Sequence, residues 1–301
     1  MGEVKSFDLQ RRVVSHMTSQ SWQNIPHVSF LYEPDITGFY EEYRAFAEEK
    51  SRAGLKLSFN TVMLRTIVEG LKAAPELNSV ISYQHKKGEG TLQTRDDINI
   101  CIPWLLPDRR MITPVISHAE SKNLDDLSRA VAETAERIRN TNVDELLYQA
   151  VFSDTIAELK RFHLGILRRI IASKISFHRV SGLSGKAKSN YYKIPESNRL
   201  SNENLVSGTV TVSNIGSLYQ AQRGCFALLE IIPPQIFAVG LGAVQEKPGV
   251  YSEEGEKKVG IRKTLPMCLV FDHRATDFSS LIPFLKTLDG IFAEPSVLRG
   301  W

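Results

Sequence analysis

A histidine and an aspartate near the C-terminus are the two residues of this sequence whose types and spacing best fit catalysis. His273 follows the apolar run 267–271, which has the length of a β-strand, and Asp277 stands four residues later, where an amphipathic segment begins. Imidazole has an ordinary pKa near neutral pH, so a histidine held at a strand end can act as a general base. For this pair alone the alternative is structural: a hydrogen-bonded His273 and an Asp277 that caps the next helix.

A serine at the end of a second predicted strand is the next candidate. β-Branched residues alternate through residues 208–217, and the segment ends in a polar turn, which places Ser213 at or near the strand end. Taken alone, Ser213 is interpreted as an ordinary turn hydroxyl.

Three segments resemble one known family. Residues 272–278 read Asp-His-Arg-Ala-Thr-Asp-Phe, similar to the Asp-His-Arg-x-x-Asp-Gly signature of the dihydrolipoamide acyltransferases of 2-oxo acid dehydrogenase complexes. The strand that ends near Ser213 resembles that family's Gly-Thr-Phe-Thr-x-hydroxyl-Asn segment, and residues 231–242 resemble its proline-containing turn and apolar strand. Chloramphenicol acetyltransferase is a more distant resemblance. The similarity covers residues 11–142 and 208–301.

The resemblance implies a mechanism. His273 takes the proton from a thiol, of coenzyme A or of a dihydrolipoyl group, as the sulfur attacks a thioester carbonyl. Ser213 donates a hydrogen bond to the oxyanion of the tetrahedral intermediate. Asp277 holds the local structure by pairing with an arginine, for which Arg11 and Arg12 are candidates by analogy. In the family the site lies between subunits of a trimer, with the histidine from one subunit and the hydroxyl from its neighbour.

The resemblance also implies the substrates and partners. We expect coenzyme A or acyl-CoA as a substrate, a homotrimer, and a lipoyl or carrier domain on another chain, without a covalent lipoyl site, a metal or nucleic acid in this one. Three departures from the family pattern are the Phe at position 278 in place of Gly, the expected lack of a lipoyl or subunit-binding domain before Arg11, and a long basic insertion. A catalytically degenerate trimeric scaffold of the same fold is therefore the alternative to an active acyltransferase.

Composition limits the class of protein. A chain of 301 residues that is 42% apolar can bury a large core. No long apolar run predicts a membrane span, and residues 1–10 contain no apolar signal-peptide core, so we expect a cytoplasmic protein. Cys101, Cys225 and Cys268 lie in largely apolar surroundings without metal-ligand spacing, and are predicted to be buried free thiols.

The resemblance and the hydrophobic patterns together predict an α/β fold. We expect a two-layer sandwich like that of chloramphenicol acetyltransferase, a mixed sheet covered by helices, formed by residues 1–301 as a single domain. His27, after Pro26 in the first predicted strand, is interpreted as a structural histidine. The pattern predicts helices over 7–20, 36–52, 58–75 and 124–138, and strands over 25–32, 78–83, 98–102, 112–116 and 267–271.

Residues 143–205 form an insertion for which the resemblance is weak. Between Lys160 and Arg199 there are ten Lys or Arg and one acid, Glu196, whereas the whole chain carries only +3. Apolar and basic residues interleave over 156–174, which indicates a basic amphipathic helix, and residues 181–204 are predicted to be a polar loop. Three interpretations stay open: a solvated face packed on its own core, a docking surface for an anionic cofactor or partner, and a membrane-surface helix.

Overall fold

The structure is a computed structural model of the chain, and it describes residues 2, 4, 6, 7, 9–149 and 182–301. Its helices are α1 (Leu9–Asn24), α2 (Thr37–Arg52), α3 (Phe59–Ala73), α4 (Leu124–Arg139), α7 (Gly185–Tyr191), α8 (Glu203–Val206) and α9 (Phe278–Ala293). Its strands are β1 (His27–Tyr32), β2 (Ser79–Gln84), β3 (Glu89–Thr94), β4 (Ile100–Cys101), β5 (Trp104–Leu105), β6 (Met111–Ile112), β7 (Val115–Ile116), β8 (Val210–Asn214), β9 (Phe237–Leu241), β10 (Gln245–Glu253), β11 (Glu256–Thr264) and β12 (Met267–Asp272).

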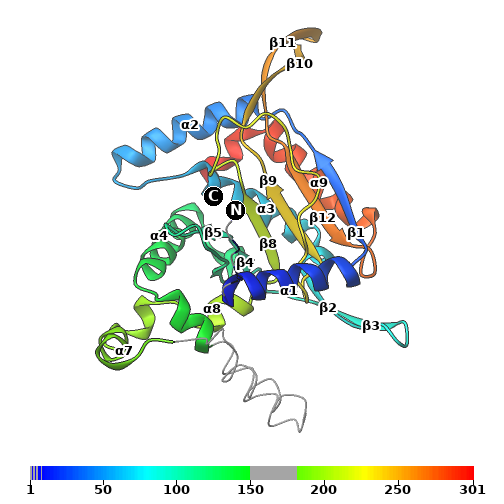
Figure 1. Cartoon of the computed structure of the whole chain (residues 1–301). Helices are drawn as coiled ribbons and strands as arrows, with labels where there is room; N and C mark the ends of the chain where they lie inside the picture. The colour runs from blue at the N-terminus through cyan, green and yellow to red at the C-terminus, as the bar shows by residue number, and fades with distance from the viewer. Residues whose placement is uncertain (1, 3, 5, 8, 150–181) are drawn as a thin grey trace.

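A six-stranded sheet forms the centre of the molecule, in the order β1-β12-β9-β8-β4-β7 (Figure 1). β8 runs parallel to both of its neighbours, whereas the remaining pairs of the sheet are antiparallel. Three further pairs, β2–β3, β5–β6 and β10–β11, form separate two-stranded sheets. The predicted mixed sheet is therefore confirmed.

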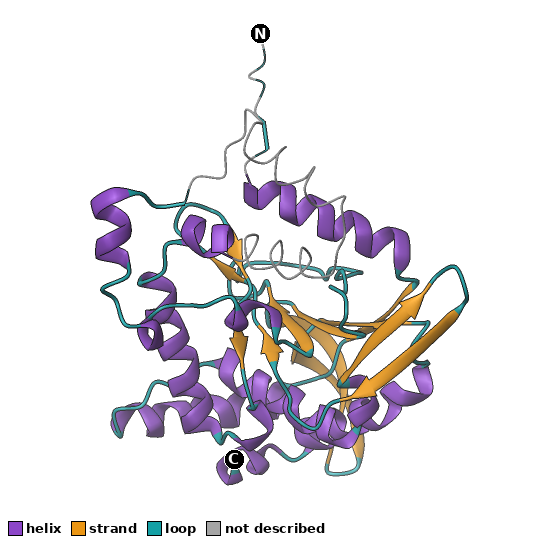
Figure 2. Ribbon diagram, turned by 90° about the horizontal axis from the view of Figure 1, so that it is seen from below, coloured by secondary structure: helices purple, strands orange, loops and turns teal. Residues whose placement is uncertain are grey.

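One face of this sheet packs against α2, α3 and α9. Alternate residues of β12, Met267, Leu269 and Phe271, join one large apolar cluster with residues of these helices, because successive side chains of a strand point to opposite faces. The α3 residue Gly70 allows close packing here: a Cβ at this position would lie 2.6 Å from the ring of Phe284 in α9. Most helices lie on one side of the sheet (Figure 2), so the predicted two-layer α/β fold is confirmed.

The opposite face is covered by a loop rather than by a full layer of helices. Cys268 and Val270 of β12 pack there with Ile231 and Phe226 of the segment between β8 and β9. α1 lies over the same side, where Ser21 donates a hydrogen bond to the Ile231 carbonyl at 2.6 Å. The helix predicted over 7–20 is thus present, and it continues to Asn24.

Several predicted boundaries have a visible physical cause. Ser58 caps α3 by accepting a hydrogen bond from the Thr61 backbone N–H at 3.1 Å, as its sequence position indicated. The strand predicted over 112–116 was wrong, because Pro114 lacks a backbone donor and divides it into two short strands. The first pairs with β5 and the second with β4.

Only part of the insertion lies within the described residues. The basic amphipathic helix predicted over 156–174 falls outside them. The polar loop predicted over 181–204 was wrong in part, because α7 occurs there with a buried Tyr191 whose ring lies under the Arg199 guanidinium at 5.2 Å. Among the helices that the structure describes, none is long and apolar enough to cross a membrane.

Candidate active site

A tight turn after β12 carries His273. The buried carboxylate of Asp272 accepts hydrogen bonds from the Arg274 backbone N–H at 2.9 Å and from its guanidinium at 2.6 Å. The His273 backbone N–H donates to the Pro26 carbonyl at 3.1 Å, which ties the turn to the start of β1. Asp272 and Arg274, to which sequence reasoning assigned no role although both belong to the motif, therefore fix the position of the histidine.

A second anchor of this turn is Glu76, in the short helical turn after α3. Its carboxylate accepts hydrogen bonds from the hydroxyls of Thr276 at 3.4 Å and Ser280 at 2.7 Å. The guanidinium of Arg274 lies over the ring of Tyr83 in β2, with Cζ 5.0 Å from the ring centre. The sequence pattern gave no sign of these contacts, since the partners are about 200 residues apart along the chain.

The contacts of the His273 ring define which nitrogen can act as a base. Nδ1 lies 3.2 Å from the carbonyl oxygen of Thr276 and 3.3 Å from a carboxylate oxygen of Asp277. Because both neighbours are acceptors, the proton of the neutral imidazole is assigned to Nδ1, which leaves the Nε2 lone pair unprotonated. The side chain is 50% exposed, so the imidazole is not enclosed by the protein.

Asp277 stands at the N-cap position of α9, but its side chain makes no capping hydrogen bond. Its carboxylate, 74% exposed, pairs with His273. The pairing expected with Arg11 or Arg12 does not occur among the ion pairs of the described residues. In this structure the carboxylate of Asp277 lies 3.3 Å from Nδ1 of His273.

Phe278, which stands where the family signature has glycine, does not cover the imidazole of His273. The ring of Phe278 packs edge-on against Phe30 of β1, with centroids 5.1 Å apart. It is itself 42% exposed. The aromatic ring therefore packs on the sheet edge, while His273 stays half-exposed.

Ser213 lies near the end of β8, with its side chain on the loop-covered face. Val210 and Val212 belong to the apolar cluster of the helical face, so alternation turns Ser213 the other way. Within the described residues no hydrogen bond engages its hydroxyl. The following turn is fixed by Asn214, which accepts a hydrogen bond from the Ser217 backbone N–H at 3.0 Å and donates to Asn60 of α3 at 2.9 Å.

Within one copy of the chain, His273 and Ser213 lie far apart. Ser213 stands opposite Gly240 of β9, which stands opposite Cys268 at the beginning of β12. His273 follows the last residue of the same strand, five residues after Cys268. At about 3.3 Å per residue and about 4.8 Å per strand, the two side chains are on the order of 20 Å apart. The structure does not bring the predicted base and the predicted oxyanion donor together in one chain.

His27 has the contacts of a structural residue. Its Nε2 accepts a hydrogen bond from the Ile231 backbone N–H at 3.1 Å and lies 3.3 Å from the Ser21 hydroxyl. Burial lowers the pKa of His27 below its ordinary value, because the charged imidazolium loses hydration. These contacts agree with the structural interpretation.

The three cysteines differ in their environments. All are free thiols, as predicted, and Cys101 and Cys268 are buried. Cys225 is exposed, so the prediction that all three are buried was wrong. Burial raises the pKa of Cys268 to about 11, which keeps it a neutral thiol at neutral pH. Among the described residues no group of three or more His, Cys, Asp or Glu could hold a metal ion.

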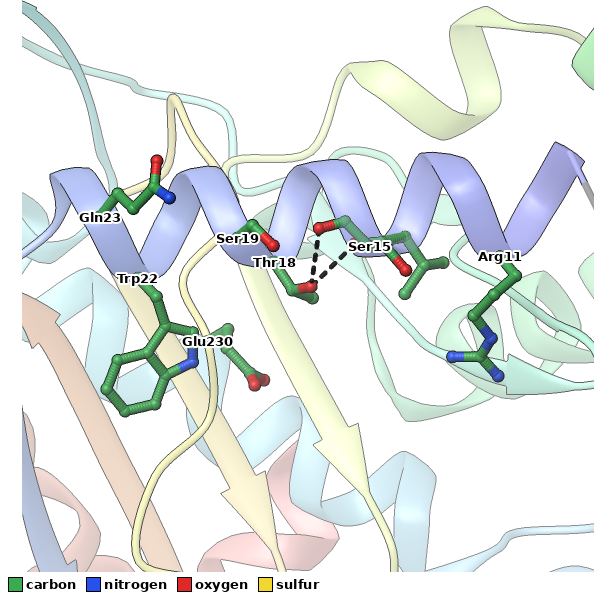
Figure 3. Close-up of a pocket in the computed structure, with 8 residues that line it drawn as sticks. Arg11, Ser15, Thr18, Ser19, Trp22, Gln23 and Glu230 are labelled. Atoms are coloured by element: carbon green, nitrogen blue, oxygen red, sulfur yellow. Dashed lines mark hydrogen bonds between the residues drawn. The ribbon is translucent and has the colours of Figure 1, made fainter. Parts of the chain in front are cut away.

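A surface hollow of about 500 Å³ lies along α1 (Figure 3). Its lining includes Arg11, Trp22 and Glu230, and none of the three predicted site residues belongs to it. Trp22 and Glu230 lie next to each other in this view, on the same side of the helix. The hollow is therefore separate from the histidine turn.

Solved structures first identify the fold. The chain is similar to dihydrolipoamide acetyltransferase of Azotobacter vinelandii, with 19% identity and a TM-score of 0.67. The match covers 99% of this chain and 94% of that chain. That structure was determined to investigate the roles of a serine, a histidine and an asparagine in the catalytic mechanism of the Azotobacter enzyme. A cubic core of the pyruvate dehydrogenase multienzyme complex gives 20% identity and a TM-score of 0.64, with 99% and 95% covered. The chain thus has the fold of acetyltransferase cores.

The sequence comparison then gives the family. The model of the 2-oxoacid dehydrogenases acyltransferase (catalytic domain) matches residues 3–147 and 184–299, and the chain belongs to this family. A dihydrolipoyllysine-residue acetyltransferase component of the pyruvate dehydrogenase complex, from Mycobacterium bovis, is 23% identical over 280 residues, 92% of this chain. The match spans only 39% of that relative's length.

Proposed function

We propose that the protein is an acyltransferase that moves an acyl group between a thioester and a thiol, at a site formed by two copies of the chain. His273 of one copy is the general base, Asp277 orients it, and Ser213 of a neighbouring copy donates a hydrogen bond to the oxyanion. The observation that carries this proposal is the placement of His273 and Ser213 at opposite ends of one sheet, with His273 half-exposed and Ser213 partly buried.

The chemistry follows from the protonation state of the histidine. A free thiol with a pKa of about 8.5 is mostly protonated at neutral pH, so the reaction needs a base. The Nε2 atom of His273 takes the S–H proton as the sulfur attacks the thioester carbonyl. The tetrahedral intermediate then collapses, the original C–S bond breaks, and the departing thiolate receives the proton from the imidazolium.

The substrates are proposed from the relatives. The Mycobacterium bovis relative is a dihydrolipoyllysine-residue acetyltransferase. We therefore assign coenzyme A or acyl-CoA as one substrate and a dihydrolipoyl group, carried by a lipoyl domain on another chain, as the other. The histidine and asparagine studied in the catalytic mechanism of the Azotobacter vinelandii enzyme are four positions apart, the same spacing as His273 and Asp277, which supports the role of Asp277.

The assembly and the domain organisation belong to the same proposal. A trimer forms three such shared sites by repeating one contact between copies. The similarity to a cubic core of the pyruvate dehydrogenase multienzyme complex supports self-association. We further propose one catalytic domain interrupted by the basic insertion. The family model leaves residues 148–183 unmatched, within the segment 143–205 that the sequence marked as inserted.

Complementation between two inactive variants tests the shared site. His273→Ala and Ser213→Ala are each expected to lower the formation of S-acetyldihydrolipoamide from acetyl-CoA and dihydrolipoamide by about 100-fold or more. When the two are co-expressed, a site can take its histidine from one variant and its serine from the other. Random mixing restores roughly one quarter of the parent activity.

The matched control is co-expression of His273→Ala with the His273→Ala/Ser213→Ala double variant, in which no pairing supplies an intact histidine. Recovery in the first mixture and none in the control supports the proposal. Lack of recovery in mixed oligomers of confirmed composition contradicts a site shared between copies, and full activity of His273→Ala contradicts the catalytic role.

A further inference from the structure

The β10–β11 hairpin projects from the body of the molecule (Figure 1). Its strands pair in unbroken register from Gln245↔Thr264 to Glu253↔Glu256. The two residues between them, Glu254 and Gly255, both have positive φ, 53° and 85°, as a tight two-residue hairpin turn requires. The long exposed arm is thus a defined element rather than a loose loop.

One face of the arm is covered by its own side chains. Arg262 lies over the ring of Tyr251, with Cζ 4.5 Å from the ring centre. The glycines opposite make room for this packing, since a Cβ at Gly249 would lie 2.8 Å from the Arg262 side chain and one at Gly260 would lie 3.1 Å from the Tyr251 ring. Arg262 also pairs with Asp35 at 2.6 Å, so this face is the one anchored to the body.

The other face is apolar and bare. Val250 pairs with Val259, and Pro248 pairs with Ile261, so these four side chains lie next to one another on one face of the ladder. Val250 is 67% exposed, and Val259 and Ile261 are each 76% exposed. The ion pair between Glu246 and Lys263, at 2.8 Å, closes the base of this strip.

A two-stranded arm with an exposed apolar face has little stability of its own in water. A two-stranded hairpin is marginal by itself in water, and adjacent exposed β-branched side chains on a strand pair favour association. The tip, with Glu253, Glu254 and Glu256, is strongly charged, whereas the strip behind it is uncharged. The charge pattern limits contact to the middle of the arm and directs it to one face.

We infer that the apolar face of the β10–β11 arm docks on a second copy of this chain. The arm connects Leu241 at the end of β9 with Met267 at the beginning of β12, two residues that pair with each other, and Leu241 also pairs with Asn214 beside Ser213. The arm therefore leaves the sheet at the Ser213 end. A copy that brings its His273 to this Ser213 arrives next to the arm. The inference rests on the shared site of the proposed function for its choice of partner.

Charge insertion on the bare face tests the docking. The Val259→Lys/Ile261→Lys variant is expected to shift the molar mass, measured by light scattering and sedimentation over a range of concentrations, from oligomer toward monomer. Circular dichroism is expected to stay unchanged, because both side chains are exposed in the single chain. The control, Leu92→Lys, places one lysine on an exposed apolar position of the β2–β3 hairpin and is expected to leave the mass unchanged.

Hydrogen exchange gives a second measurement on the unaltered protein. The backbone amides of β10 and β11 are expected to become more protected as the concentration rises through the association range, while those of β2 and β3 stay constant. Constant exchange of the arm through that range, or an unchanged oligomer in the double variant, would overturn the docking.

The two proposals fail separately. If the double variant stays oligomeric while complementation succeeds, the shared site stands and the arm is not the contact. If the double variant dissociates while complementation fails, the arm is the contact and the shared site is wrong.

Discussion

Asp277 holds a carboxylate oxygen 3.3 Å from Nδ1 of His273, on the side of the ring that also faces the carbonyl of Thr276 at 3.2 Å. Two acceptors on one ring nitrogen fix both the tautomer and the orientation of the imidazole. The carbonyl belongs to the backbone and cannot be removed by mutation, whereas the carboxylate can. The contribution of Asp277 is therefore separable from that of the turn.

We predict that Asp277→Asn keeps most of the acyl transfer activity and that Asp277→Ala loses more. An asparagine oxygen can still accept the Nδ1 proton, whereas alanine cannot. Because the carboxylate is 74% exposed, the loss in Asp277→Ala is expected to be about 10-fold in kcat rather than the larger effect of removing the base. The kcat and KM of both variants check this. Equal loss in both would indicate that the negative charge, rather than the hydrogen bond, is what matters.

Ser213→Ala is predicted to lower kcat by about 100-fold to 1000-fold with little change in KM. The oxyanion exists in the tetrahedral intermediate and not in the ground state, so a donor aimed at it acts mainly on the rate. Steady-state kinetics for both substrates measure the two parameters. The control is Ser207→Ala, which removes an exposed hydroxyl that donates a hydrogen bond to the Glu203 carbonyl at 2.9 Å. A rise in KM at unchanged kcat would contradict the assignment.

Arg274→Met is predicted to destabilise the fold by about 3–5 kcal/mol, because it leaves the fully buried carboxylate of Asp272 without its partner. Chemical denaturation measures the change in the free energy of unfolding. The double variant Asp272→Asn/Arg274→Met removes the uncompensated charge together with its partner, and is expected to lose less than the single variant. A double variant less stable than Arg274→Met would refute this account of the turn.

The two strand ends that carry His273 and Ser213 were predictable from sequence, whereas the distance between these residues was not. The apolar run before His273 and the alternation before Ser213 indicated two strand ends, and the structure has strands there. The separation of the two residues depends on strand order and register. Those are set by contacts such as Ser213↔Gly240 and Gly240↔Cys268, between positions that no local pattern relates.

The β10–β11 arm was not predicted for a different reason. Strand patterns are recognised by one apolar face that packs on a core, and this arm has no core beneath it within one chain. Its apolar positions are interrupted by Gly249 and Gly260, which ordinarily indicate a turn or a weak strand. Their role became visible only when the rings and guanidinium that lie over them were seen.

His27 is predicted to make the protein less stable as the pH falls. Burial lowers its pKa in the folded state, so below the ordinary value of about 6.5 the unfolded chain binds a proton that the folded chain does not. Since stability rises with pH wherever the unfolded state binds more protons, stability is retained above that value and falls on acidification. Protonation of Nε2 would also break the hydrogen bond from the Ile231 N–H, which has an N···N distance of 3.1 Å.

Thermal melts from pH 7.5 to 5 are expected to show a steeper fall in Tm for the parent than for His27→Gln, whose amide oxygen can accept the same bond without titrating. Parallel curves for the two proteins would show that another group is responsible for any acid sensitivity.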